Sequence, residues 1–165
     1  MTSPYDPGAW TDLFVATVGA TAALTGLIFV GVSINLTRIT AFKGLPERAL
    51  EAIVLLLTAM TISIFGLVPQ DGLILGIELL ILGLAGVAAV GMFQTVQWRS
   101  VDPKFRAHLL GRAALEQLAV LCFAAAGMTL VLHAGGGLYW VAPGLALSIV
   151  ASVLNAWVLL VEILR

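Results

Sequence analysis

The stretch GATAALTGLIFVGVSINL, residues 19–36, carries no charge and is apolar enough to cross a lipid bilayer. It nevertheless contains three glycines, two threonines, a serine and an asparagine. Lipid does not require small or hydroxylated side chains, whereas contacts between membrane helices are enriched in them. The stretch therefore predicts a membrane-spanning helix that faces protein or water rather than lipid.

The composition of the whole chain also predicts a membrane protein. Of its 165 residues, 61% are hydrophobic and 10% are charged, and the mean hydropathy is +1.08. A soluble domain has about a quarter of its residues charged, so this chain cannot hide its apolar surface in a single core surrounded by water. The net charge of −1 gives no support for a nucleic-acid partner, and the single Cys122 excludes an internal disulfide.

Five apolar runs reach the ~20 residues that a membrane-spanning helix needs. They cover residues 13–36, 49–68, 73–97, 113–133 and 138–164. The N-terminal segment lacks the basic region that begins a secretory signal peptide, so we expect the first run to stay in the mature protein. The prediction is an all-α polytopic membrane helical bundle that forms a single five-helix domain over residues 1–165.

Basic residues give the expected orientation. With five spans, the segments after the first and third spans and the C-terminus lie on one side, and all eight Lys and Arg residues belong to that side. Because basic loops stay in the cytoplasm, we expect an external N-terminus and a cytoplasmic C-terminus in a bacterial plasma (inner) membrane. The aromatic residues expected at the outer interface are Tyr5, Trp10, Tyr139 and Trp140.

The first span has two faces that both favour protein neighbours. One stripe carries hydroxyl and amide groups, and its residues are Thr17, Thr21, Leu24, Ile28, Gly31 and Asn35. The opposite stripe is a groove of small residues, Gly19, Ala22, Ala23, Gly26 and Ser33. The span is therefore either a central helix packed on both sides, or a helix that contacts other copies or lines a pore on a symmetry axis. Lipid exposure of both faces is the third alternative.

Polar groups at membrane depth are candidate functional residues because lipid leaves them without partners. Glu78 and His133 are both expected near the outer ends of their spans, where they either pair to hold a cation or a proton, or are wetted by headgroups. A threonine can return its hydroxyl to its own helix backbone. Asn35 is not expected to satisfy its amide in that way.

Polar residues also occur in the inner third of all five spans. They are Asn35, Glu51, Gln94, Gln97, Glu116, Gln117, Asn155 and Glu162. This layer fits a water-filled vestibule, a polar network between helices, or simple wetting at the interface. Arg48, three residues before Glu51, is the expected local partner of that carboxylate.

No pattern of catalytic or cofactor-binding chemistry is present in the sequence. His108 and His133 are expected on opposite sides of the membrane and Cys122 has no companion, so no metal-ligand spacing occurs. No phosphate-binding glycine motif occurs, and no serine or cysteine lies at matching depth with a histidine. We therefore expect no enzymatic activity, no cofactor and no bound metal.

Three parts of the chain carry a resemblance to a known family. They are GATAALTGLIFVGVSINLTRI (19–39), LPERALEAIVLLL (45–57), and GGLYWVAPG (136–144) followed by LNAWVLLVEILR (154–165). Together they resemble a family of small multi-pass membrane proteins from high-GC actinobacteria. Similar proteins are often named modulators of a membrane-bound ATP-dependent protease of the FtsH type. The resemblance implies a partner in the membrane, without catalytic or binding residues to carry over.

Two functions follow from the sequence. The leading hypothesis is a homo-oligomer with the first span at the shared contact, around a permeation path for a small ion or solute. Its expected polar stations are Thr17, Thr21, Asn35, Glu78, Glu116, His133 and Asn155. The alternative is an accessory protein that docks on another membrane complex through the groove at Gly19, Ala23 and Gly26.

Overall fold

The computed structural model describes residues 4–41, 44–100 and 106–164, and every regular element in those ranges is a helix. The elements are η1 (Pro7–Trp10), α1 (Thr11–Ile34), α2 (Leu36–Ala41), α3 (Leu45–Leu67), α4 (Gly72–Ser100), α5 (Arg106–Val131), η3 (Gly137–Trp140) and α6 (Val141–Leu164). Five of them are long and apolar enough to cross a membrane. The predicted all-α polytopic bundle with five spans is confirmed.

Local sequence explains where the spans begin and end. The Asp6 carboxylate accepts the Gly8 N–H at 3.0 Å and caps η1. Gly44 has a φ of +90°, which only glycine adopts without strain, and the chain turns there into α3. The observed spans agree with the predicted ones to within a few residues, except that α5 begins at Arg106 instead of residue 113.

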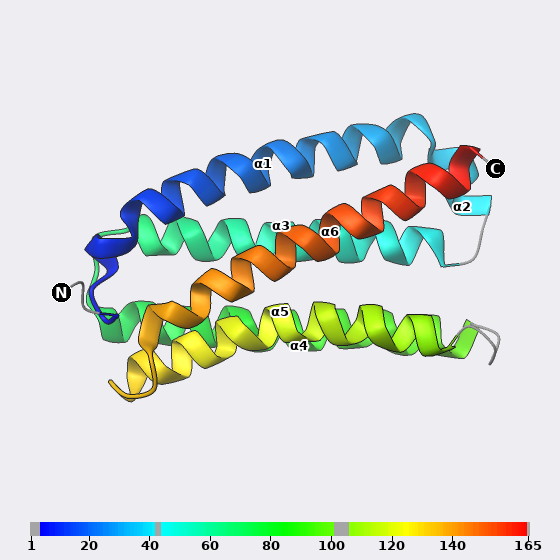
Figure 1. Cartoon of the computed structure of the whole chain (residues 1–165). Helices are drawn as coiled ribbons and strands as arrows, with labels where there is room; N and C mark the ends of the chain where they lie inside the picture. Colours follow the sequence, from blue (N-terminus) through cyan, green and yellow to red (C-terminus); the bar gives the residue numbers. More distant parts are fainter. Residues whose placement is uncertain (1–3, 42–43, 101–105, 165) are drawn as a thin grey trace.

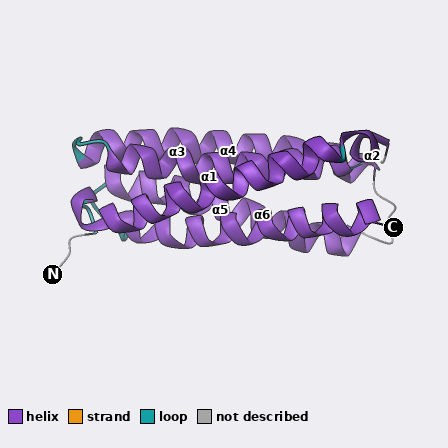
Figure 2. Cartoon of the chain, turned by 90° about the horizontal axis from the view of Figure 1, so that it is seen from above, coloured by secondary structure: helices purple, strands orange, loops and turns teal. Residues whose placement is uncertain are grey.

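Helices α3, α4, α5 and α6 form a ring in which each packs on the next and α6 closes on α3. Helix α1 lies outside the ring against α3, and α6 crosses the bundle diagonally (Figure 1). Seen from above, the helices run along one long axis (Figure 2). The interpretation of the first span as the central helix is therefore wrong, because α3 is the helix that contacts α1, α4 and α6.

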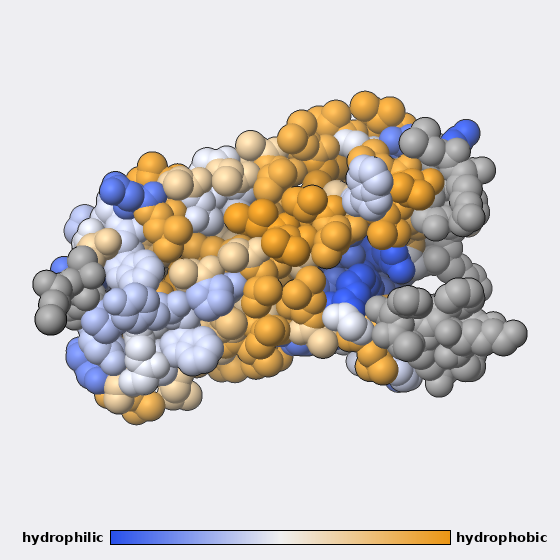
Figure 3. Space-filling model, viewed as in Figure 1, coloured by the Kyte–Doolittle hydropathy of each residue, from blue (hydrophilic) through white to orange (hydrophobic). Residues whose placement is uncertain are grey.

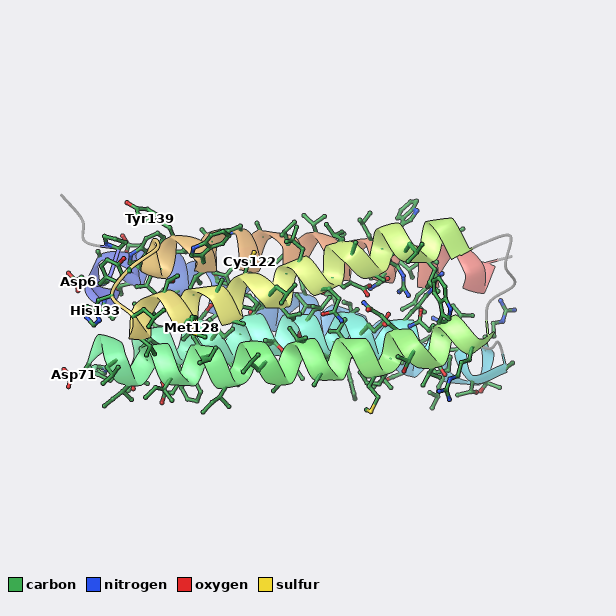
Figure 4. The ribbon with its side chains drawn as sticks, turned by 90° about the horizontal axis from the view of Figure 1, so that it is seen from below. Asp6, Asp71, Cys122, Met128, His133 and Tyr139 are labelled. Atoms are coloured by element: carbon green, nitrogen blue, oxygen red, sulfur yellow. The ribbon has the colours of Figure 1, made fainter. Side chains whose placement is uncertain are left out.

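The two ends of the bundle differ in composition. At one end, here called the η1 end, lie η1, the last turn of α3 and η3. Asp6, Asp71, His133 and Tyr139 are found there (Figure 4). The opposite end, the α2 end, holds α2 and the described basic side chains Arg38, Arg48, Arg99 and Arg112. The predicted gathering of basic residues at one end is confirmed for the described residues, and the side of the membrane that each end faces stays a prediction.

The aromatic residues predicted at one interface do lie together at the η1 end. Trp10 meets Tyr139 edge-on with ring centroids 5.2 Å apart. The Trp140 indole N–H donates to the Gly135 carbonyl at 2.9 Å. Aromatic residues with one apolar and one polar side suit the boundary between lipid and water.

Apolar packing fills the bundle from the η1 end to its middle. Phe14, Leu75, Phe123 and Leu138 are fully buried in one cluster. Helices α4 and α5 approach closely there, since a Cβ atom on Gly127 would overlap the Leu80 backbone. Glycines that let backbones approach in this way are the usual means of packing membrane helices.

Candidate functional site

A buried charged cluster lies inside the ring near the α2 end, and Arg112 of α5 is at its centre. The Arg112 guanidinium donates to the Glu51 carboxylate of α3 at 2.8 Å and to the Asn155 side-chain oxygen of α6 at 2.9 Å. It also donates to the Gln97 side-chain oxygen of α4. One side chain therefore joins all four helices of the ring, which a long planar guanidinium with five N–H donors can do.

Glu116, one turn after Arg112 on α5, is the best-satisfied carboxylate of this cluster. Its Oε1 accepts the Asn155 amide at 2.8 Å and lies 3.4 Å from the guanidinium of Arg112. Its Oε2 accepts the Gln94 amide at 3.2 Å. Both carboxylate oxygens thus have donors, and hydrogen bonds of this kind stabilise the ionised form.

Gln94 and Gln117 extend the cluster toward the middle of the bundle. The Gln117 amide donates to the Gln94 oxygen at 3.2 Å, and the Gln94 amide also donates to the Ala113 carbonyl at 3.2 Å. The alternative of a polar network between helices is therefore confirmed for the described residues of the inner layer, with two exceptions. Asn35 is outside the cluster, and the side chain of Glu162 is outside the described residues.

The cluster is deep but can be reached from the α2 end. Glu51, Glu116 and Asn155 have no exposed surface, whereas the Arg112 side chain is 15% exposed. Glu51 is six residues into α3, about 9 Å along the helix axis from its start. Figure 3 shows strongly hydrophilic surface recessed between α6 and the α4–α5 pair near this end. The cluster therefore reaches the surface of the bundle at least on this side face, near the α2 end.

Charges and hydrogen bonds in the cluster are incompletely matched. Two carboxylates, Glu51 and Glu116, face the single guanidinium of Arg112. Among the described residues, the buried Glu51 Oε1, Gln97 Nε2 and Arg112 Nε have no hydrogen-bond partner. Unpaired buried polar groups are costly, so this arrangement suits a site that takes up a further polar or positively charged species.

Sequence reasoning found most of the cluster but missed its centre. Arg112 was placed in the basic connecting segment, whereas it lies in the second turn of α5 and points into the bundle. The signal that could have found it is its spacing of four residues from Glu116, which puts both on one helix face. The partner of Glu51 in the cluster is likewise Arg112 on α5, instead of the expected local Arg48.

The polar stripe on α1 lies against the protein and not on a free face. Thr17 and Thr21 are buried. Their hydroxyls donate to the Leu13 and Thr17 carbonyls at 2.8 and 2.7 Å. The Asn35 amide donates to the Gly31 carbonyl at 3.0 Å, so the expectation that this amide could not bond to its own helix is wrong. The buried Thr17 and Thr21 hydroxyls are therefore not available to line a path between copies.

Glu78 and His133, the other two predicted stations, are not paired with each other. Glu78 accepts the Gln70 amide at 2.7 Å. His133 stacks on Tyr5 with ring centroids 5.6 Å apart. Both residues lie at the η1 end, far along the bundle from the charged cluster. The structure brings together only Glu116 and Asn155 of the seven predicted stations.

The small-residue groove on α1 is uncovered within the chain. Gly19, Ala23 and Gly26 are exposed, and a Cβ atom added to either glycine would have no atom within 4 Å. In contrast, a Cβ on Gly66 of α3 would meet the Phe14 ring. The glycines of α1 thus leave room for the backbone of another helix, and no described part of this chain occupies that room.

The described residues contain no group of three or more His, Cys, Asp and Glu side chains that could hold a metal ion. Comparison with known proteins gives no match, since no family model, no curated protein and no solved structure is similar to this chain. The fold and the cluster therefore define a multi-pass helical membrane protein with a buried polar site.

Proposed function

We propose that this chain is a non-enzymatic protein of the bacterial plasma membrane, with its α2 end in the cytoplasm, that works as a homo-oligomer. In this proposal α1 provides the contact between copies, and each bundle offers a polar station to a small ion or solute that enters from the cytoplasm. The observation that carries the proposal is the cluster around Arg112, which has an excess carboxylate and unpaired polar atoms at membrane depth.

The geometry of the bundle supports a station within each protomer. Thr17 and Thr21 are buried against α3, so they cannot line a path between copies. The cluster, in contrast, lies between four helices and reaches the surface at the α2 end. Charged groups are kept at such depth mainly where a protein handles ions or polar solutes.

One-sided packing of α1 supports self-association. Its inner face contacts α3, whereas Val15, Leu27 and Phe29 are more than half exposed on the other sides. Lipid can cover such large apolar residues, but the adjacent groove at Gly19, Ala23 and Gly26 is shaped for another helix.

Flux and mass measurements test the two parts of this proposal. Purified protein in liposomes should pass a small ion or solute, and Asn155→Leu should abolish the flux because it removes a polar group from the cluster. The control is Asn35→Leu, since Asn35 lies outside the cluster. Native mass spectrometry should give one defined stoichiometry. A strict monomer would contradict the assembly, and equal flux with and without Asn155 would contradict the station.

The second candidate is an accessory protein that docks on another membrane complex through the same groove. The uncovered Gly19 and Gly26 serve either partner equally. The sole Cys122 is buried, so Cys122→Ala with Ala23→Cys places one reactive thiol in the groove. Self-adducts in native membranes favour the homo-oligomer, and adducts to one larger protein favour docking.

A further inference from the structure

Among the described side chains, the charge balance of the Arg112 cluster leaves one negative charge without a partner. When Glu51 and Glu116 are both ionised, the single guanidinium neutralises only one of them. Both carboxylates are completely buried among apolar helices. A buried excess charge is strongly disfavoured at membrane depth, so a positive charge must join the cluster or one carboxylate must become neutral.

The hydrogen bonds show which carboxylate is left over. Glu116 has donors on both oxygens, from Asn155 and Gln94, and it also lies 3.4 Å from the Arg112 guanidinium. Glu51 has the Arg112 donor on Oε2 and the Gln97 side chain beside its carboxylate, while no described donor meets hydrogen-bond geometry at its fully buried Oε1. Because both Glu116 oxygens already accept hydrogen bonds, Glu51 Oε1 is the carboxylate oxygen of the cluster with a lone pair left for a proton.

A proton fits this position better than a metal ion. The guanidinium of Arg112 lies between the two carboxylates and would repel a second cation. No third acidic or histidine side chain among the described residues joins them. A proton needs only one lone pair, which Glu51 Oε1 offers.

We propose that the cluster binds and releases one proton at Glu51 Oε1, exchanged with water at the α2 end. Uptake converts the Glu51 carboxylate into a carboxylic acid and leaves Arg112 paired with Glu116, so the cluster becomes neutral. Release restores the net negative charge and favours entry of water. This inference deepens the proposed station and does not depend on self-association.

Among the described side chains, few other charged groups lie near Glu51. Helix α5 contributes Arg112 and Glu116, and α4 contributes the neutral Gln97, followed by Arg99 on the exposed surface. Helix α6 contributes the neutral Asn155 among its described side chains. On α3 itself Glu47 and Arg48 lie one turn nearer the α2 end, and α2 carries the exposed Arg38. Arg112 and Glu116 are thus the charges that govern the proton.

Infrared spectroscopy of the full-length protein in nanodiscs tests this inference. The carbonyl band of a buried carboxylic acid should be present at about pH 7, where an ordinary glutamate is ionised. Glu51→Gln should remove the band. Glu116→Gln should also remove it, because Glu51 and Arg112 then balance. Arg112→Gln should raise it about twofold, because both carboxyl groups must then be neutral.

Glu78→Gln is the matched control, since it removes a half-buried carboxyl at the opposite end and should leave the band unchanged. Glu51→Gln decides the question even if the other variants fail to fold, because it removes the excess charge and keeps Arg112 paired. A band that is absent from the wild type, or that survives Glu51→Gln, would overturn the inference. The inference would also be overturned if the band appeared only after sodium and potassium were replaced by a large organic cation. That result would mean that sodium or potassium normally supplies the missing positive charge of the cluster.

These outcomes are separable from those of the proposed function. If the band behaves as expected and no flux is found, the proton site stands and the transport role fails. If flux depends on Asn155 and the band is absent, the polar station in the cluster is supported, and the species that binds there is not a proton.

Discussion

Both the η1 half and the α2 half of the bundle have buried apolar clusters, but among the described residues the α2 half adds a buried ion-pair cluster. In the η1 half, Phe14, Leu75 and Phe123 fill the space, and α4 approaches α5 across Gly127. In the α2 half, one guanidinium joins four helices through side-chain hydrogen bonds. The second arrangement brings three buried polar atoms without partners together, on Glu51, Gln97 and Arg112, whereas the η1 end has the Trp10 Nε1 atom among the described residues.

This difference indicates a division of roles. The close apolar packing of the η1 half makes that half rigid, because tightly packed interiors resist changes of shape. A charged cluster with incomplete pairing is sensitive to protonation and to added ions. We therefore expect the η1 half to respond to changes of volume and the α2 half to changes of charge and pH.

The largest effect is expected from Arg112→Met. It leaves two buried carboxyl groups without a cation, and removing one partner of a buried ion pair costs about 3–5 kcal/mol. The loss should be greatest at neutral pH and should shrink as the pH falls, because the unfolded chain then also binds the protons that the buried carboxyl groups take up on folding. Thermal unfolding in detergent measures it, with the exposed Arg99→Met as the control. Equal melting temperatures for both variants would contradict the central role of Arg112.

A second large effect is expected from Gly127→Ala in the η1 half. The new Cβ would overlap the Leu80 backbone, and an overfilled interior costs about 1–3 kcal/mol or more. Gly111→Ala on the same helix has open space and should be neutral or stabilising by about 0.5–1 kcal/mol. Neither change should depend on pH. If both variants melt alike, the close approach of α4 and α5 is absent.

A smaller effect separates two buried serines of α6. The Ser152 hydroxyl donates to the Ala52 carbonyl at 3.0 Å, so Ser152→Ala should cost about 1 kcal/mol. The Ser148 hydroxyl is buried without a partner among the described residues, so Ser148→Ala should cost nothing. The pair of melting temperatures checks this. A larger loss for Ser148→Ala would show that Ser148 has a partner outside the described contacts.

The smallest effect concerns Glu78 at the η1 end. A double-mutant cycle of Glu78→Gln and Gln70→Ala should give a coupling of about 0.5–1 kcal/mol, since the two side chains are hydrogen-bonded. A second cycle, of Glu78→Gln and His133→Ala, should give no coupling, because His133 stacks on Tyr5 instead. If Glu78 were coupled to His133 and not to Gln70, the Glu78–His133 pair considered from the sequence would be supported.

The sequence predicted single-helix properties well and contacts between helices poorly. Hydropathy located all five spans, and the polar layer was recognised on Glu51, Glu116 and Asn155. The role of α1 was misjudged because small and hydroxylated residues occur both on packed faces and on free ones. Thr21 is buried and Gly26 is exposed, although both were expected to contact protein.

The sequence by itself determined that the chain forms five membrane spans with its basic residues at one end, because the apolar and charged residues along the chain fix both. Only the tertiary structure decided that α3 is central, that α1 is peripheral, and that Arg112 joins four helices. Those outcomes depend on the rotation and depth of each helix relative to its neighbours. The close approaches at glycines such as Gly127 set these positions, and hydropathy does not encode them.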